Sequence, residues 1–390
     1  MTSLVNRILC RVSLSLITAG AVTTAAAQHS EIGPTTDAQV QSQNKTKIAL
    51  IVSPKGSVLS EAAAPIQQGI LAASREATAS GACELVQYEL SSPQDAGAVL
   101  KKAADDGAVL VIGPVSRDAV QTISEMPYLP LPVVAINRPS GETAPELFLS
   151  IDISAESEVD QLAKIAVENT AQKTDLAANN FVILTTQDPY DERLARAMEA
   201  ALIKAGAGAE RRHISSDQIA YLRQEMRGKA FRGVFFAMNT QNASLLRPYL
   251  PPELPVFGTS YTNPMHQKDS MLAKTQANDL NGMITLEIPA EGNASTLVAQ
   301  YKGDRENLSP EELQMFSVGV DAWQLGTKWI DWARRIEVPD GLTGRLSFDK
   351  DNGSKVKREL VKTVVSPNKT GKTSEEDLVQ FTESAEEAGL

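Results

Sequence analysis

Three short apolar runs decide the fold: residues 47–52 (KIALIV), 108–112 (AVLVI) and 132–136 (PVVAI). Each run is continuous rather than alternating, which is typical of strands buried on both faces of a parallel sheet. Each is followed by turn-forming residues, namely Ser53-Pro54-Lys55-Gly56, Gly113-Pro114 and Asn137-Arg138-Pro139. Because the carboxyl ends of parallel strands meet at one edge, we expect the three loops to gather there, where open α/β sheets bind their ligands.

A second series of the same kind follows residue 150. Strands are predicted at residues 181–185 (FVILT), 233–237 (GVFFA) and 255–258 (PVFG), with helices such as 191–205 between them. Further along, residues 279–288 are predicted as a strand, 310–335 as one long helix, and 344–348 and 355–364 as closing strands. This order predicts an α/β protein of two Rossmann-like lobes with parallel sheets, joined by three crossovers near residues 138–149, 262–281 and 336–345.

The predicted boundaries follow from these elements. The first lobe takes residues 46–138 plus 282–336, and the second takes 150–261 plus 345–366. Two domains also suit the length of 390 residues, since single cores stop growing at about 250–300 residues. Residues 28–45 and 367–390 are polar and without periodicity, so we expect a disordered leader and a disordered tail.

Residues 1–27 have the composition of a signal peptide. Arg7 and Arg11 form a basic region, residues 12–24 are apolar to neutral, and three alanines precede Gln28. The apolar run is shorter than the ~20 residues of a membrane helix, so we predict a periplasmic protein without a transmembrane segment in the mature chain. Cys10 precedes the apolar run, which does not support an outer-membrane lipid anchor. Cys83 alone would remain, which excludes an internal disulfide.

Charge and motifs argue against several classes of function. The formal net charge is −11, and no basic cluster with interleaved aromatic residues suggests nucleic-acid binding. The three histidines lack zinc-site spacing, and no phosphate-binding or nucleophile motif is present. Ser366 and Lys369 fit Ser-x-x-Lys, but the Lys-Thr-Gly motif shares Lys369, so chance is the better explanation. We predict a protein that is not an enzyme and has no metal or cofactor.

Polar residues at the predicted sheet edges are candidates for ligand binding. The candidates are Ser53, Ser57, Ser116 and Asn137 in the first lobe, Asp188, Tyr190, Ser260 and Tyr261 in the second, and Asp321 in the long helix. Ser116 and nearby backbone N–H groups suit a carboxylate, although a helix N-cap is the commoner use of such a serine. For Asp188 and Ser260, turn formation is as good an explanation as binding. For Asp321, we favour a structural role, because unpaired buried acids are costly.

Several short motifs resemble one protein family. They are residues 319–323 (GVDAW), 341–346 (GLTGRL), 245–250 (LLRPYL), 255–260 (PVFGTS) and 279–282 (DLNG). In order and spacing they resemble the C-terminal domain of the penicillin-binding protein activators, the LpoA/LppC family, over residues 47–365. The resemblance implies a type I periplasmic binding protein fold.

The resemblance also implies a function: a periplasmic regulator that binds and stimulates a class A penicillin-binding protein, a peptidoglycan synthase of the cell wall. The alternative is the solute receptor of an ABC importer for amino acids or small peptides, so a small-molecule or muropeptide ligand stays possible. A receptor needs polar groups that converge from both lobes in a mostly apolar pocket. A cell-wall enzyme is the third hypothesis, and it lacks recognisable catalytic residues.

Overall fold

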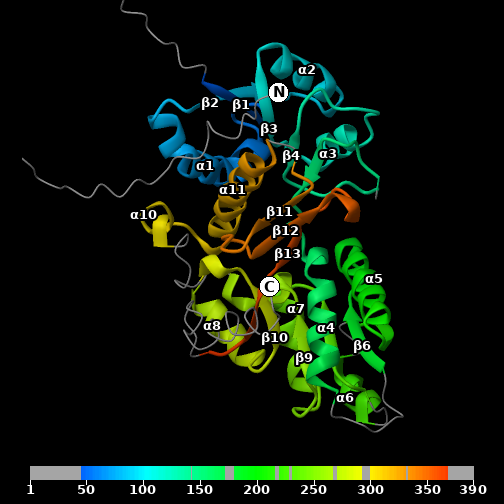
Figure 1. Cartoon of the computed structure of the whole chain (residues 1–390). Coiled ribbons are helices and arrows are strands. Elements are labelled where there is room, and N and C mark those ends of the chain that lie inside the picture. Colours follow the sequence, from blue (N-terminus) through cyan, green and yellow to red (C-terminus); the bar gives the residue numbers. More distant parts are fainter. Residues whose placement is uncertain are drawn as a thin grey trace, which may run out of the picture.

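In this computed structural model, the structure describes residues 45–141, 143–171, 180–215, 219–227, 231–266, 270–291, 299–330 and 333–367. The predicted signal peptide, nearly all of the leader and nearly all of the tail lie outside the described residues. The described chain forms two α/β lobes, one above the other in Figure 1, with a small three-stranded sheet between them. This confirms the predicted fold class.

The first lobe is built on a parallel sheet in the order β2-β1-β3-β4-β5. Its strands are β1 (Thr46–Val52), β2 (Cys83–Glu89), β3 (Ala108–Ile112), β4 (Val133–Ala135) and β5 (Phe148–Ser150). Its helices are α1 (Val58–Ala79), α2 (Ala96–Asp105), α3 (Arg117–Ser124) and the late helix α11 (Pro310–Trp329). All three apolar runs that decide the fold are therefore strands of this one sheet.

The second lobe has a sheet in the order β14-β10-β9-β8-β6-β7, parallel except for β14. Its strands are β6 (Asn180–Thr185), β7 (Gly208–His213), β8 (Val234–Ala237), β9 (Val256–Gly258), β10 (Ile284–Glu287) and β14 (Val361–Val364). Its helices are α4 (Val159–Asn169), α5 (Pro189–Lys204), α6 (Ile219–Arg227), α7 (Thr240–Leu246) and α8 (Ser270–Asp279). The short helix α10 (Lys302–Arg305) precedes α11.

The predicted lobe boundaries need two corrections. Residues 282–287 do not belong to the first lobe, because β10 pairs with β9 and β14 in the second sheet. Residues 345–359 do not belong to the second sheet either. They form β12 (Arg345–Asp349) and β13 (Lys357–Glu359). In the small sheet, β12 is the central strand and pairs antiparallel with both β11 (Arg335–Val338) and β13. The apolar pattern identifies a strand but not the sheet in which it pairs, so these assignments could not come from the pattern alone.

Helix α11 crosses α1 at close range and contributes side chains to the cores of both lobes. A Cβ atom added at Gly319 would lie 2.0 Å from the carbonyl oxygen of Ile66, and one at Gly69 would lie 2.0 Å from that of Phe316. Only glycine allows the two backbones to approach this closely. Along the same helix, Phe316 and Val320 pack into the core of the second lobe, whereas Trp323 packs into the core of the first. One rigid helix thus belongs to both cores.

Candidate functional site

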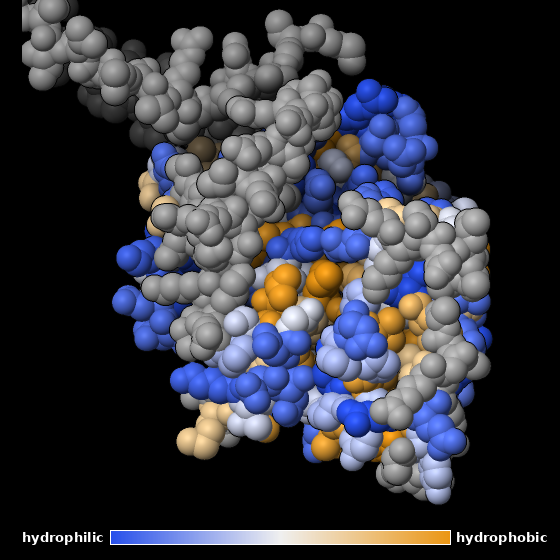
Figure 2. Space-filling model, turned by 90° about the horizontal axis from the view of Figure 1, so that it is seen from below, coloured by the Kyte–Doolittle hydropathy of each residue, from blue (hydrophilic) through white to orange (hydrophobic). Residues whose placement is uncertain are grey.

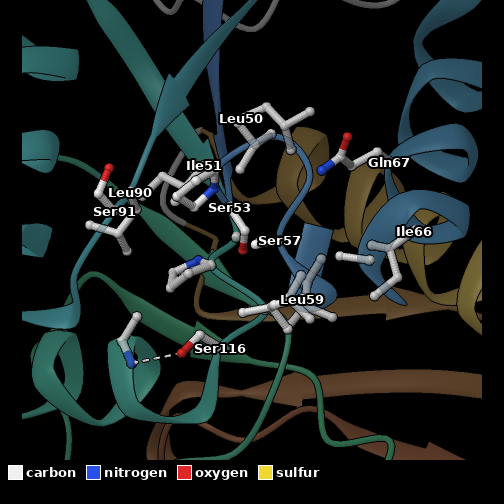
Figure 3. Close-up of a pocket in the computed structure, with 18 of the residues that line it drawn as sticks. Leu50, Ile51, Ser53, Ser57, Leu59, Ile66, Gln67, Leu90, Ser91 and Ser116 are labelled. Carbon is white, nitrogen blue, oxygen red and sulfur yellow. Dashed lines mark hydrogen bonds between the residues drawn. The ribbon is translucent and has the colours of Figure 1, made fainter. Parts of the chain in front are cut away.

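A cavity of about 240 Å³ lies at the carboxyl edge of the first sheet. It is bounded by the loops after β1 and β3, the start of α1 and the segment after β2 (Figure 3). Its lining residues include Ser53, Ser57, Leu59, Ala63, Ile66, Gln67, Ile70, Leu90, Ser91, Val115, Ser116 and Ile136. The cavity therefore lies where the strand pattern predicted that loops would gather, and its described lining comes entirely from the first lobe.

Two of the predicted serines in this cavity are helix caps. The Ser57 hydroxyl oxygen accepts from the N–H of Ser60 at 3.1 Å and caps α1, while that of Ser116 accepts from Ala119 at 3.4 Å and caps α3. Figure 3 shows the Ser116 oxygen directed at the backbone of its own helix. Within the described chain, the Ser53 side chain makes no hydrogen bond. The two amino-terminal caps and Ser53 thus bring three hydroxyl groups to one cavity.

Asn137 binds backbone instead of lining this cavity. Its amide nitrogen donates to the carbonyl oxygen of Val115 at 3.2 Å, and its side-chain oxygen accepts from the N–H of Arg138 at 2.9 Å. The side chain thereby fastens the loop after β4 to the loop after β3. Both of its polar atoms are engaged in positioning the loops that surround the cavity.

The four predicted residues of the second lobe lie at the carboxyl edge of its sheet. Asp188 caps α5 by accepting from the N–H of Tyr190 at 2.8 Å. The rings of Tyr190 and Tyr261 pack edge to face with their centroids 4.7 Å apart. The structure therefore brings together side chains that follow β6 and β9 in the sequence.

A buried carboxylate that the sequence did not reveal closes this edge. Both oxygens of Glu158 accept from Ser260, one from its backbone N–H at 2.7 Å and the other from its hydroxyl. Glu158 is fully buried. Its partner lies 102 residues away along the chain, so no local motif could have identified the pair. Ser260 is thereby held by the protein itself.

Other charged and phenolic groups of this edge also bind one another. Glu156 pairs with Arg193, whose guanidinium lies 4.8 Å from the centre of the Tyr190 ring. Burial raises the pKa of Tyr190 and that of Tyr261 to about 12. Burial also raises the pKa of Asp191, whose carboxylate accepts from the Thr186 hydroxyl at 2.6 Å. The second edge is therefore a network of internal contacts built around two neutral tyrosines.

Asp321 is bound inside the protein, as expected for the structural role that the sequence favoured over ligand binding. Its carboxylate is fully buried and accepts from the N–H groups of Leu342 and Thr343, both at 2.8 Å, and from the Thr343 hydroxyl at 2.6 Å. Burial nevertheless raises the pKa of Asp321 to about 6. The side chain fastens α11 to the turn that leads into β12. These hydrogen bonds connect the GVDAW motif at residues 319–323 to the GLTGRL motif at residues 341–346.

The described residues contain no group of three or more His, Cys, Asp or Glu side chains arranged to hold a metal ion. Over the same part of the chain, no helix combines the length and apolar character required to cross a membrane. The chemistry of the two edges is therefore that of hydroxyls, amides, tyrosines and paired carboxylates.

Comparison with known proteins gives a match to one family model over part of the chain and a similarity in fold to solved structures. Residues 22–211 match the family model described as LppC putative lipoprotein. A search of curated proteins gave no match. Among solved structures, a putative branched-chain amino acid ABC transporter from Chromobacterium violaceum aligns with a TM-score of 0.67 and 23% identity, over 82% of this chain and 100% of that one.

A second similar structure is the C-domain of LpoA from Haemophilus influenzae, described as a regulator of PBP1A. It aligns with a TM-score of 0.63 and 16% identity, over 82% of this chain and 98% of that domain. Full-length LpoA from the same organism aligns with a TM-score of 0.62 and 17% identity, over 83% of this chain and 58% of that protein. At these identities the structures establish a shared fold, the type I periplasmic binding protein fold.

Proposed function

We propose that this chain, an LppC-like protein with the type I periplasmic binding fold, acts in the periplasm as a regulator that binds and stimulates a class A penicillin-binding protein. The LppC match and the similarity to LpoA, described as a regulator of PBP1A, support the proposal. The function is exerted by protein docking rather than by chemistry on a substrate. Stimulation requires that docking favour the active conformation of the synthase.

The observation that carries the proposal is the closed edge of the second lobe. A solute receptor surrounds its ligand with polar groups that converge from both lobes. Here Ser260 is held by Glu158, Asp188 caps a helix, and Tyr190 packs on Tyr261. These second-lobe groups are engaged with one another, which favours a docking protein over a receptor.

Exposed apolar side chains on the second lobe also suit a docking role. Tyr221, Leu245, Tyr249, Met271 and Leu272 are each at least 40% exposed and come from α6, α7 with the turn after it, and α8. Figure 2 views this lobe from below and shows apolar residues gathered between hydrophilic ones. Apolar areas rimmed by polar residues mark interaction surfaces, and a stable complex needs about 800 Å² on each partner.

The test uses the mature chain and a purified class A synthase from the same organism. We expect the chain to retain the synthase in a pull-down and to increase glycan polymerisation from lipid II with a saturating dose response. Serum albumin at the same concentration is the control for crowding. Failure to bind the synthase together with an unchanged polymerisation rate contradicts the proposal.

The solute receptor is the second candidate, and the serine-lined cavity of the first lobe favours it. Binding to the folded state alone raises the melting temperature, so a thermal-shift screen with free amino acids and muropeptides separates the two functions. A reproducible shift with a free amino acid supports the receptor. A flat response across free amino acids, combined with stimulation of the synthase, supports the regulator.

A further inference from the structure

The lining of the first-lobe cavity does not suit a free amino acid, which carries a charged ammonium and a charged carboxylate group. Aliphatic side chains dominate it, among them Leu59, Ile66, Ile70 and Leu90. No described residue in this lining is Asp, Glu, Lys, Arg or His. A ligand with an ammonium group would have to bury that charge without a carboxylate to pair with it, which costs far more than burying a neutral group.

The polar groups of the cavity suit an amide. In the described chain, neither the Ser53 hydroxyl nor the Gln67 side-chain amide forms a hydrogen bond with another residue of the protein. A primary amide both donates and accepts, and a hydroxyl does the same, so the two side chains match the N–H and C=O groups of a peptide bond. Figure 3 shows that Ser53 and Gln67 come from different elements, the loop after β1 and helix α1.

The cavity lining meets solvent at Leu59, and we call this part of the lining the mouth. Leu59 stands in the first turn of α1, lines the cavity and is 36% exposed to solvent. Burying an aliphatic group of a ligand against Leu59 removes apolar surface from water on both partners. The mouth therefore favours a ligand that continues outside the cavity over a small one that is fully enclosed.

We infer that the first-lobe cavity binds an uncharged aliphatic side chain that is part of a peptide, with the adjoining peptide groups held by Ser53 and Gln67. Free aliphatic amino acids are poor ligands, because the described lining offers no carboxylate to pair with their ammonium group. The inference goes beyond the proposed function: it holds whether or not the chain stimulates a synthase.

The experiment compares three small ligands on the folded mature chain by ligand-observed NMR titration. N-acetyl-leucinamide carries the neutral side chain and two amides, free leucine carries the same side chain with two charges, and N-acetyl-lysinamide carries the amides with a charged side chain. We expect N-acetyl-leucinamide to bind at least about tenfold more tightly than either of the others. Equal or tighter binding of free leucine, or no binding of N-acetyl-leucinamide, would overturn the inference.

Two neighbouring alanines of α1 provide a matched pair of variants. Ala63 lines the cavity and is buried, whereas Ala62 is exposed. Ala63→Leu fills the cavity and should weaken N-acetyl-leucinamide binding at least about tenfold, and Ala62→Leu should leave it unchanged. Leu59→Asp places a charge at the mouth, on a side chain that is already 36% exposed, and should also weaken binding about tenfold. Unchanged binding in folded Leu59→Asp, or in folded Ala63→Leu, locates the ligand elsewhere and overturns the inference.

The same variants identify the source of the peptide group. Loss of synthase stimulation in Leu59→Asp, alongside loss of N-acetyl-leucinamide binding, supports the site and assigns its natural occupant to a segment of the synthase. Full stimulation with lost N-acetyl-leucinamide binding supports the site and assigns its occupant to a free peptide. If instead the wild-type chain binds N-acetyl-leucinamide but does not stimulate the synthase, the proposed function fails and the cavity inference stands.

Discussion

The carboxyl edges of the two sheets occupy equivalent places in similar lobes, and their chemistry is opposite. The first edge encloses a cavity of about 240 Å³ with an aliphatic lining. The second edge is closed by its own contacts, with Glu158 bound to Ser260 and Tyr190 packed on Tyr261. The same architecture thus leaves one edge available to a ligand and uses the other for internal structure.

The difference shows that equivalent position in a fold does not imply equivalent function. Ligands of open α/β sheets bind at this edge as a rule, and the rule alone treats both lobes alike. The two edges differ in whether their polar side chains have hydrogen-bond partners within the protein. Ser53 in the first lobe has no partner in the described chain, whereas Ser260 in the second has its N–H and its hydroxyl both bound to one buried carboxylate.

The largest loss of stability is expected at the crossing of α1 and α11, because α11 packs into the cores of both lobes. In Gly319→Ala the new methyl group meets the backbone of Ile66, which cannot move aside as a flexible side chain would. We expect the free energy of unfolding to fall by about 4 kcal/mol or more, measured by chemical denaturation, because overpacking against backbone exceeds the usual 1–3 kcal/mol.

Gly303→Ala is the control for this change. Gly303 lies in α10, and an added Cβ there has no neighbour within 4 Å. We expect that substitution to be neutral or to stabilise by about 0.5–1 kcal/mol. Similar losses in both variants would show that the crossing of α1 and α11 is not the cause.

The next largest loss of stability is expected from a substitution at the closed edge of the second lobe. Glu158→Gln removes the buried negative charge that accepts from the backbone N–H and the hydroxyl of Ser260, and leaves a single amide oxygen where there were two carboxylate acceptors. We expect a loss of about 2–4 kcal/mol in the free energy of unfolding, since two hydrogen bonds to a buried charge are replaced by weaker bonds to a neutral amide. Asp105→Asn, which removes an exposed ion pair with Lys101, is the control and should cost less than about 1 kcal/mol. If both variants lose equally little, the second edge is not held by Glu158.

Three strands of the first sheet, β1, β3 and β4, could be predicted from the sequence almost residue by residue, whereas β2 and β5 could not. The run at 108–112 is strand β3, and the run at 47–52 differs from β1 by one residue. Continuous apolar runs bounded by turn residues carry this information locally. In contrast, the pairing of β10 depends on which sheet offers a free edge, and nothing in residues 284–287 encodes that choice.

The candidate site was predictable only in part, for the same reason. Ser53, Ser57 and Ser116 follow buried strands, so their meeting at one edge could be predicted. Leu59 and Leu90 line the cavity because of how α1 packs and where β2 ends, and the sequence gives no local sign of either. Asp321 shows the opposite case, since its motif was visible in the sequence but its partners, Leu342 and Thr343, lie on a distant turn.

Asp321 makes the stability of the fold depend on pH, through its contacts between α11 and the turn before β12 and not through either sheet edge. Its pKa in the folded chain is about 6, above the ordinary value of 3.8, so the folded state holds a proton that the unfolded state has lost between these values. The stabilisation from this group is therefore fully present below about pH 4 and is lost as the pH rises through 6. Between about pH 4.5 and about pH 7, we expect the stability gap between wild type and Asp321→Asn to narrow by about 2 kcal/mol. A gap that is constant or widens with pH would show that the buried carboxylate is ionised throughout.

The smallest change in stability is expected at the edge of the first lobe, where a helix-capping serine can be compared with a serine that has no partner in the described chain. The Ser116 oxygen accepts from the N–H of Ala119, so Ser116→Ala should lower the free energy of unfolding by about 1 kcal/mol, the usual cost of losing an N-cap. Ser53→Ala removes a hydroxyl without a partner in the described chain, so its stability should change by less than about 0.5 kcal/mol. Thermal and chemical denaturation of the two variants measure the difference. The Ser53 hydroxyl is available to a ligand, whereas the Ser116 hydroxyl is used as a helix cap. We therefore expect Ser53→Ala to weaken the binding of N-acetyl-leucinamide without lowering the stability of the fold. A stability loss in Ser53→Ala equal to that in Ser116→Ala would mean that both edges, and not the second alone, are occupied by internal contacts.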